Sequence, residues 1–304
     1  MKKITFKAAI LLLTIFFSSS SFAQDDFQGK AYYQSKTTMN LDDFGGREMS
    51  AERKKQIQER MKSFLEKEYI LTFNKTESIY KEDEKLEAPG SGRGFGRFGS
   101  SLSGGPKYKN VKDKELLQDQ EFFGKQFLIK DELKTLEWKM GSETKQIGQY
   151  TCFKATATKT VDEFDWRSMR RRGRGNDQKN EGEKAKDSTK TADKTNNNED
   201  DPMNEIEVPK TIEIVAWYTV QIPINQGPDD YWGLPGLILE INADRTTILC
   251  TKIVLNPQEK EKIDKPEKGE EVTQAEYNAT VKKKMQEMRE MYGRRGGRGG
   301  GRRN

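Results

Sequence analysis

The chain has 304 residues, with 54 Lys and Arg against 49 Asp and Glu, no histidine and two cysteines. Apolar residues make up 33% of it and charged residues 34%, and both values depart from the globular average toward disorder. A single hydrophobic core over the whole length is therefore not expected. Without histidine there is no Ser-His-Asp triad and no His-ligated zinc, and two cysteines cannot supply a four-thiolate zinc site. Neither a metal nor a cofactor is expected.

The N-terminus has the pattern of an export signal. Three lysines at positions 2, 3 and 7 precede an apolar run over residues 8–17, and the small residues Ser21 and Ala23 then form a cleavage pattern. A run of this length cannot cross the ~30 Å hydrocarbon layer of a membrane. We therefore predict a signal peptide over residues 1–23 and a mature chain that begins at Gln24 and does not span a membrane. Its expected location is periplasmic, outer-membrane-associated or extracellular.

Alternating apolar and polar residues predict that the rest of the chain is made mainly of strands. The clearest case is residues 211–222, where every second residue from Ile212 to Ile222 is apolar, while Val215 and Trp217 lie on the opposite face. Further strands are predicted over residues 27–39, 69–73, 127–129, 135–140, 150–159, 237–241 and 248–255, with a short one that ends at Tyr80. Because most successive strands have no helix between them, antiparallel pairing is expected.

Two segments interrupt the strands with helical periodicity. Ser50 can cap the first, and Thr273 with Glu276 forms a capping box at the start of the second. The apolar stripes are Ile57, Met61, Phe64 and Leu65 on the first helix and Val281, Met285, Met288 and Tyr292 on the second. We expect these amphipathic helices to pack on the domain or on each other. The alternative is a helix that binds a partner or a membrane surface, and the mixed charges of the polar faces argue against lipid.

Three segments have a composition typical of disorder. Residues 83–106 are rich in Gly, Ser and Arg, residues 162–207 are highly charged, and residues 293–304 are mostly Arg and Gly. We expect one β-rich domain over residues 24–292, interrupted by the first two segments and followed by a disordered tail. The Arg-Gly runs are similar to RNA-binding segments, but an exported chain rarely meets RNA. We interpret them as solvated spacers or weak tethers to anionic envelope polymers and expect no specific nucleic-acid partner.

Cys152 and Cys250 both lie in predicted strands. In an oxidising compartment they can form an inter-strand disulfide. They can equally be two small, buried apolar side chains. The sequence leaves both alternatives open.

The loop after the strand at residues 211–222 contains the most specific motif. Pro223 cannot donate a backbone hydrogen bond to a sheet, so it ends that strand. The sequence Leu-Pro-Gly at residues 234–236 suits a type II turn with a positive φ at Gly236, after which the next strand begins. This motif predicts a strand, a long turn and a second strand.

The hexapeptide Gly233-Leu234-Pro235-Gly236-Leu237-Ile238 resembles the one that names the GLPGLI family of secreted Bacteroidetes proteins. Residues 147–156, in which Tyr150 stands two before Cys152, resemble a second signature of that family, with Gln149 where Gly is frequent. The resemblance implies a mainly β fold with a curved, bowl-like antiparallel sheet. The two amphipathic helical insertions and the disordered Arg-Gly segments lie outside the resemblance. It implies no reaction. It indicates accessory modules of secreted enzymes, or proteins associated with outer-membrane transport.

We therefore expect a secreted or periplasmic, non-enzymatic β-sheet binding or accessory module of the cell envelope. Its partner would be an outer-membrane transport component or an envelope glycan. The candidate ligand-binding residues are Trp217, Tyr231 and Trp232, because aromatic rings with a polar edge suit carbohydrate and apolar ligands. Trp217 either lines such a site or belongs to the core. Tyr231 and Trp232 are also expected to be at least partly buried and to anchor their loop.

The alternative function is hydrolysis of envelope glycans. Asp229, Asp230 and Glu240 form a carboxylate cluster at the motif, and paired carboxylates can hydrolyse glycosidic bonds. Adjacent Asp residues after Gly-Pro are, however, more often turn residues. No nucleophile–base pair is visible beside them, so no catalytic residue is assigned.

Overall fold

The computed structural model describes residues 27–38, 50–83, 104–161 and 211–296, together with two short strands at 170–171 and 206–207. The predicted signal peptide and most of the predicted disordered segments lie outside these described residues. The two short strands, β9 (Arg170–Arg171) and β10 (Ile206–Glu207), pair with each other inside the predicted charged insert. The C-terminal helix also continues past the predicted boundary at residue 292.

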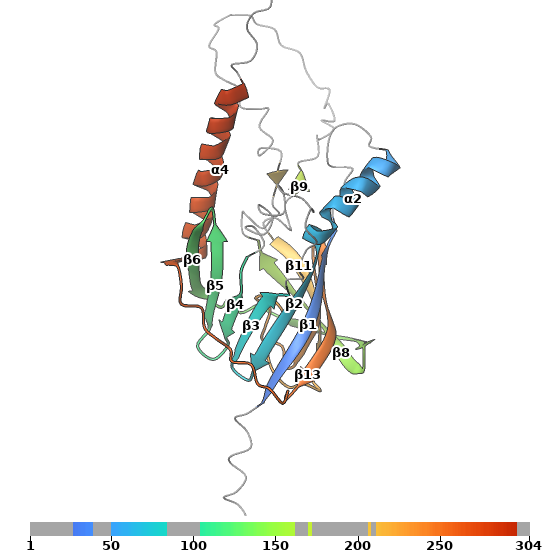
Figure 1. Ribbon diagram of the computed structural model, residues 1–304. Helices are drawn as coiled ribbons and strands as arrows, with labels where there is room; N and C mark the ends of the chain where they lie inside the picture. Colours follow the sequence, from blue (N-terminus) through green and yellow to red (C-terminus); the bar gives the residue numbers. More distant parts are fainter. Residues whose placement is uncertain are drawn as a thin grey trace, which may run out of the picture.

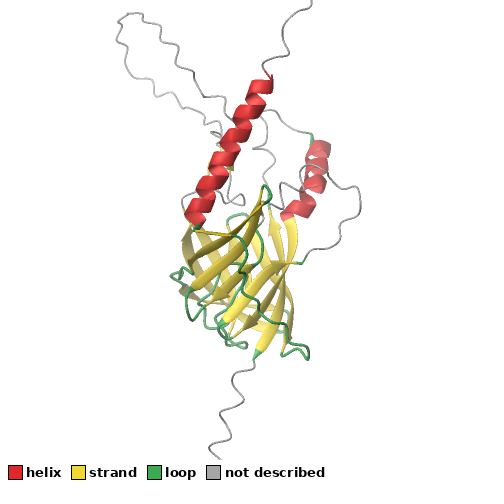
Figure 2. Ribbon diagram, turned by 60° about the vertical axis from the view of Figure 1, so that its left-hand side comes forward, coloured by secondary structure: helices red, strands yellow, loops and turns green. Residues whose placement is uncertain are grey.

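A twelve-stranded sheet forms the body of the protein (Figure 1). Its strand order is β14-β6-β5-β4-β3-β2-β1-β13-β12-β11-β8-β7, and only the pairing of β14 with β6 is parallel among these strands. The strands are β1 (Gln28–Thr37), β2 (Glu66–Asn74), β3 (Glu77–Glu82), β4 (Lys107–Asn110), β5 (Glu115–Phe122), β6 (Lys125–Glu132), β7 (Lys139–Ile147), β8 (Tyr150–Thr160), β11 (Thr211–Thr219), β12 (Leu237–Ala243), β13 (Thr246–Leu255) and β14 (Glu270–Val272). The sheet is strongly curved in Figures 1 and 2. Because this one mostly antiparallel sheet contains far more of the described residues than the two helices do, the predicted mainly β fold is confirmed.

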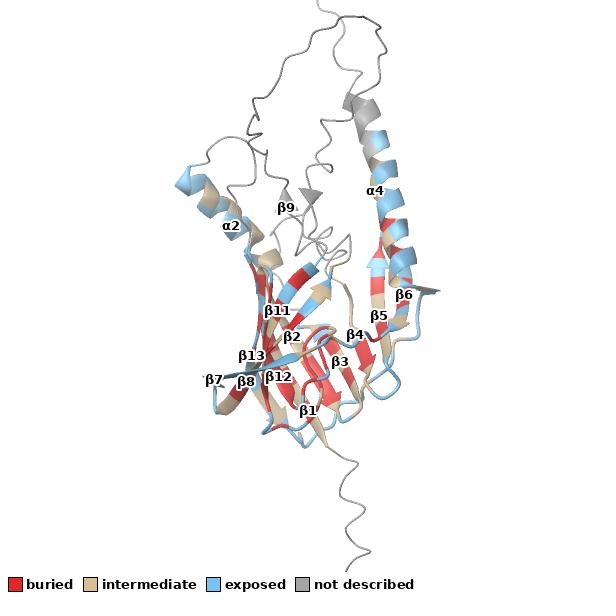
Figure 3. Cartoon of the chain, turned by 180° about the vertical axis from the view of Figure 1, so that it is seen from behind, coloured by how far each residue is buried: buried red, intermediate tan, exposed pale blue. Residues whose placement is uncertain are grey.

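One face of the sheet carries the main hydrophobic core, and we call it the core face; the opposite face is the outer face. In β11 the predicted apolar residues, Ile214 and Ala216 among them, are buried, as the alternation requires. Ala216 aligns with Ala155 of β8 and with Ile241 of β12, which are buried as well. Strand alternation thus places the main hydrophobic cluster, which includes residues of β1–β3, β8 and β11–β13, on the core face. Figure 3 shows the buried residues of these strands in red.

Two strand predictions differ from the structure, and several strands were not predicted. The segment at 135–140 is mostly not a strand, because β7 begins only at Lys139, and Trp138 instead turns in to pack against the core. β11 ends at Thr219, so Val220, which the alternation placed in the strand, is 47% exposed in a turn. β4 and β5 were not expected from the alternation of apolar and polar residues.

The two helices, α2 (Ala51–Leu65) and α4 (Gln274–Gly296), rise from the same rim of the sheet and stand apart from each other (Figures 1 and 2). Both predicted caps are confirmed. The Ser50 hydroxyl accepts the backbone N–H of Arg53 at 3.4 Å, and Glu276 Oε2 accepts the backbone N–H of Thr273 at 2.8 Å. The reciprocal bond of the capping box, from the N–H of Glu276 to Thr273 Oγ1, is 3.2 Å long.

The prediction that both apolar stripes pack along their length is only partly right. α4 buries Tyr277 and Val281 against a cluster on β5 and β6, with Met285 at its edge. Met288 is only partly buried and Met291 is 64% exposed, because α4 extends beyond the rim (Figure 3). No residue of α2 whose side chain is described is buried, and α2 continues directly into β2. Among the described residues, no helix has the length and hydropathy that a membrane crossing requires.

Candidate functional site

The long loop between β11 and β12, residues 220–236, lies over the core face. Ser78 Oγ of β3 donates to Gln226 Oε1 at 2.9 Å, so the loop reaches across the sheet to a strand far from β11 in the strand order. Within the loop, the N–H of Gly233 donates to the carbonyl of Asn225 at 3.1 Å. The motif therefore folds as a compact flap that belongs to the interior of the bowl.

Two aromatic residues anchor this flap, as predicted. Tyr231 and Trp232 are only 6% and 7% exposed. The Trp232 indole N–H donates to the carbonyl of Lys134 at 2.9 Å, and the Trp138 indole N–H donates to the carbonyl of Trp232, also at 2.9 Å. Both rings are thus occupied in the fold, and the structure places neither of them at a surface open to a ligand.

Gly236 is required for a different reason from the one predicted. It does not take a positive φ; Gly233 does, at +91°, so the predicted type II turn is wrong. At Gly236 a Cβ would stand 2.0 Å from the carbonyl oxygen of Thr219, far inside van der Waals contact. The end of β11 passes so close to residue 236 that only glycine fits.

Three lysines from the core face hold the flap. Lys107 pairs with Asp229, and Lys159 Nζ lies 2.5 Å from Asp230 Oδ2. Lys159 Nζ also lies 5.0 Å from the centre of the Tyr231 ring. Lys107 stands on β4 and Lys159 on β8, so the two aspartates tie the flap to both halves of the curved sheet.

The third lysine, Lys109, is completely buried. Its Nζ donates to the carbonyls of Gly227 and Tyr231 at 2.6 and 3.0 Å. Desolvation lowers the pKa of Lys109 to about 7, against the smaller opposing effect of nearby Asp230 and Asp229. The two backbone acceptors match the two N–H donors of the neutral amine, and these hydrogen bonds fix the flap.

The pKa values of the Lys159–Asp230 pair show an ion pair and not an acid–base couple. Burial, the largest single effect, raises the pKa of Asp230, but the charges of Lys159 and Lys107 and the hydrogen bond from Lys159 together hold that pKa below its usual value. Burial is also the largest single effect on Lys159 and lowers its pKa, but the negative charges of Asp230 and its neighbours and the hydrogen bond to Asp230 together raise the pKa above its usual value. Both groups therefore stay charged at neutral pH.

Trp217 lies on the outer face, in a separate polar network. Its neighbour across the strands, Glu240, accepts Lys145 Nζ at 2.5 Å and Asn242 Nδ2 at 2.7 Å. Lys145 Nζ stands 4.9 Å from the centre of the Trp217 ring. Asn242 Oδ1 in turn accepts the hydroxyl of Thr247 at 2.8 Å. Trp217 is partly buried against the main core, and the charged amine of Lys145 stands over its ring.

The three carboxylates considered for hydrolysis do not form one group. Lys159, the partner of Asp230, and Lys154 are five residues apart on β8, so their side chains lie on opposite faces of the sheet. Lys154, Trp217 and Glu240 are aligned on neighbouring strands and share the outer face. Asp230 is therefore bound on the core face, while Glu240 lies on the outer face. A glycosidase needs its two carboxylates on either side of one bond, within about 10 Å of each other.

The two cysteines are buried and carry free thiols in the structure. Burial raises the pKa of Cys152 to about 11 and that of Cys250 to about 12. Such thiols are protonated at neutral pH and behave as small apolar side chains. The structure thus corresponds to the second of the two alternatives left open by the sequence.

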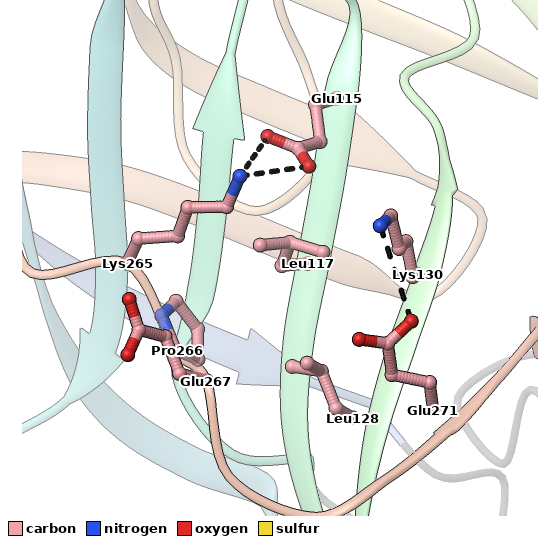
Figure 4. Close-up of a pocket in the computed structure, with 8 residues that line it drawn as sticks. All are labelled: Glu115, Leu117, Leu128, Lys130, Lys265, Pro266, Glu267 and Glu271. Carbon is pink, nitrogen blue, oxygen red and sulfur yellow. Dashed lines mark hydrogen bonds and ion pairs between the residues drawn. The ribbon is translucent and has the colours of Figure 1, made fainter.

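A small cavity of about 200 Å³ opens on the outer face of β5 and β6 (Figure 4). Leu117 and Leu128 form its apolar floor. Lys265 Nζ bonds both carboxylate oxygens of Glu115, at 2.8 and 2.9 Å. The cavity is smaller than typical ligand pockets, and Lys265 is already paired with Glu115. The cavity is therefore a weak candidate for a binding site. No group of three Cys, Asp or Glu side chains in the described part of the chain is placed to hold a metal ion.

Sequence reasoning missed the lysines that hold the flap and the Trp217 network. Lys107 and Lys109 alternate with Tyr108, and alternation alone assigns the lysines to solvent. One signal was present: two lysines on a short strand and two adjacent aspartates in an aromatic loop are complementary in charge. Of these groups only Lys107 and Asp229 pair, across 122 residues of sequence, whereas Lys109 binds flap carbonyls and Asp230 pairs with Lys159 of β8.

The fold and this geometry define a β-sheet module whose signature loop is structural. A family model described as a protein of unknown function (Porph_ging) matches residues 138–240, which include β7, β8, β11 and the flap. That match covers less than half of the chain, and its description does not carry the GLPGLI name. None of the curated proteins matches the chain.

Two solved structures, titled Structure of PNGF-II in the C2 and in the P21 space group, are similar to the chain. Each is 13% identical to it, with TM-scores of 0.44 and 0.42. The similarity covers 84% and 83% of this chain but 32% of theirs, so this chain spans about a third of their length. Likeness at this level carries no argument about function.

Proposed function

We propose that the chain is an exported, non-enzymatic binding module of the cell envelope that takes an envelope glycan on its outer face around Trp217. An outer-membrane transport component is the other partner that the resemblance suggests. The observation that carries the proposal is the contrast among the three candidate aromatic residues. Tyr231 and Trp232 are almost fully buried, whereas Trp217 is only partly buried: one side of it packs against the main core, and Lys145 stands over its ring beside Glu240.

The strand registers extend this site into a row across the sheet. Lys154, Trp217, Glu240, Leu249 and Gln34 align on successive strands β8, β11, β12, β13 and β1. Leu249 is 36% exposed and Gln34 is exposed. An aromatic ring flanked by amide, carboxylate and hydroxyl groups supports stacking and hydrogen bonding of a sugar chain that lies across the strands.

The charges of this row favour a neutral ligand. Lys145 is paired with Glu240, and Lys154 Nζ lies 2.7 Å from Glu143 Oε1. Because each lysine already has a carboxylate, the row has no excess charge with which to select an ion. Uncharged hydroxyl groups of a sugar can form hydrogen bonds to these lysines and carboxylates without breaking the ion pairs.

Affinity electrophoresis through gels that contain soluble envelope polysaccharides tests the proposal. Trp217→Ala is expected to reduce retardation roughly tenfold by removing the stacking surface. Trp138→Phe, which removes an indole hydrogen bond in the core, is the control for a general loss of stability, and it should keep retardation. Unchanged retardation of Trp217→Ala would contradict the proposed site. Loss of a measurable glycan hydrolysis in Asp230→Asn, with an unchanged melting curve, would instead establish the hydrolase.

A further inference from the structure

The two helices share a position and a charge. α2 contains five Lys and Arg against two Asp and Glu, and α4 contains six against three, so each carries a formal charge of +3. The formal charge of the entire chain is only +5, so the remainder of the molecule is close to neutral. Both helices rise from one rim of the sheet (Figures 1 and 2). Positive charge is thus concentrated on one side of the molecule.

Apart from the half-buried Lys54, the basic side chains described on these helices face solvent. Lys282, Lys283 and Lys284 on α4 are all exposed, as are Arg53 and Arg60 on α2. Lys284 lies 2.7 Å from Glu287 in an exposed ion pair, which contributes little in water. Their exposure lets a polyanion reach them while the sheet keeps its structure.

Each helix also presents apolar side chains that the sheet does not cover. Tyr277 and Val281 of α4 are buried, but the same stripe continues to partly buried Met288, and the neighbouring Met291 is 64% exposed. On α2, Ile57 and Met61 are only partly buried. A soluble anionic polysaccharide offers nothing for these side chains to contact, whereas a lipid surface offers both anionic headgroups and an apolar layer beneath them.

We propose that this helical rim, defined by α2 and α4, docks on an anionic lipid surface. The lysines and arginines would contact the headgroups, and the exposed Met291, with the partly buried Met288, would enter the boundary between headgroups and acyl chains. The mixed charges of each helix, read alone, argue against lipid. The shared rim and the net positive charge of both helices change that balance. This docking does not depend on glycan binding at Trp217, which lies on the outer face.

Sedimentation of the full chain with lipid vesicles tests the proposal. The chain is expected to bind vesicles of phosphatidylcholine mixed with phosphatidylglycerol in about 0.05 M salt, and to release them in about 0.5 M salt, because the added ions screen the attraction. It is expected not to bind vesicles of phosphatidylcholine alone. Absence of binding to the mixed vesicles would overturn the proposal.

Matched charge reversals locate the surface. Lys282→Glu, Lys283→Glu and Lys284→Glu combined should weaken binding roughly tenfold or more. The control reverses Lys75, Lys112 and Lys114, exposed lysines in the turns at the opposite end of β2, β4 and β5. It should bind within about twofold of the unaltered chain, since these lysines lie far from the rim. Equal loss in both variants would overturn the assignment to the helical rim.

A second comparison separates a lipid surface from a soluble polyanion. Met288→Ser with Met291→Ser keeps every charge and should still weaken vesicle binding several-fold, because it removes the inserting side chains. Dextran sulfate serves as the soluble polyanion. Binding to dextran sulfate as tight as to mixed vesicles, with no effect of the two serines, would show that the rim recognises charge alone and would reject the lipid proposal.

Discussion

Lys109 occupies a position at which a strand normally presents an apolar side chain. It faces the core opposite Ser78 of β3, and its amine bonds two flap carbonyls. A buried amine satisfied in this way fixes the backbone of the flap more specifically than apolar packing does, since its donors require acceptors at defined places. The same burial makes the stability of the protein depend on pH.

Stability should rise by about 1 kcal/mol between pH 6 and pH 8 because of Lys109. The pKa of this lysine is about 7 in the folded chain and about 10.4 when unfolded. Above pH 7 the folded chain has therefore released a proton that the unfolded chain still holds, and the unfolded state binds more protons. Urea unfolding at the two pH values measures this rise.

Two features of the chain allow a change in stability between pH 6 and pH 8 to be assigned to Lys109. There is no histidine to titrate between pH 6 and 8. The buried thiols, whose pKa values are raised, change stability only above the usual thiol pKa of about 8.5. Lys109→Met is the control variant, because it keeps the volume and removes the proton. If Lys109→Met showed the same rise with pH, another group would be responsible.

At the scale of elements, α4 is held by its first turns only. Val281 is 3% exposed and packs in the cluster with Phe127 and Ile129, whereas Met288 lies beyond that cluster. Val281→Asp is expected to lower the free energy of unfolding by about 2–4 kcal/mol, because it forces an unpaired charge among apolar side chains. Met288→Asp should lower it by less than about 1 kcal/mol. Chemical denaturation of both variants decides the point, and equal losses would mean that the whole stripe is packed.

How well each element could be predicted depends on which of its faces is apolar. β11 was predicted because its apolar residues all face the core. β4 was not, because Lys107 and Lys109 face the core while Tyr108, 2% exposed, is covered on the outer face near Ile263. In β4 the polar side chains therefore face the core and the apolar side chain faces outward, the reverse of the usual arrangement.

β7 was missed for another reason. It is the edge strand and mostly exposed, so burial imposes no pattern on its sequence. The helix caps, by contrast, are local signals and were predicted residue by residue. Aromatic anchoring of the flap was also predictable from its sequence, whereas the partners of Asp229 and Asp230 were not, because they come from distant strands.

At the scale of the whole molecule, the flap joins the two halves of the curved sheet. β4 and β8 are separated in the sheet by β3, β2, β1, β13, β12 and β11, yet both hold the same loop through Lys107 and Lys159. A curved sheet of many strands can flex about its middle, and a loop fixed at both sides limits that motion. The two lysines should therefore act as one unit.

A double-mutant cycle measures this coupling. Lys107→Met and Lys159→Met should each lower the free energy of unfolding by about 1–2 kcal/mol, since each leaves a largely buried aspartate without its partner. Once one lysine is gone the flap is held on one side only, so losing the second should cost less. The double variant is expected to fall short of the sum by about 0.5–1 kcal/mol. Lys107→Met with Lys145→Met, whose second site lies on the outer face with Glu240, is the control and should be additive within about 0.5 kcal/mol. Full additivity of Lys107→Met and Lys159→Met would show that the flap has two independent attachments and does not brace the sheet.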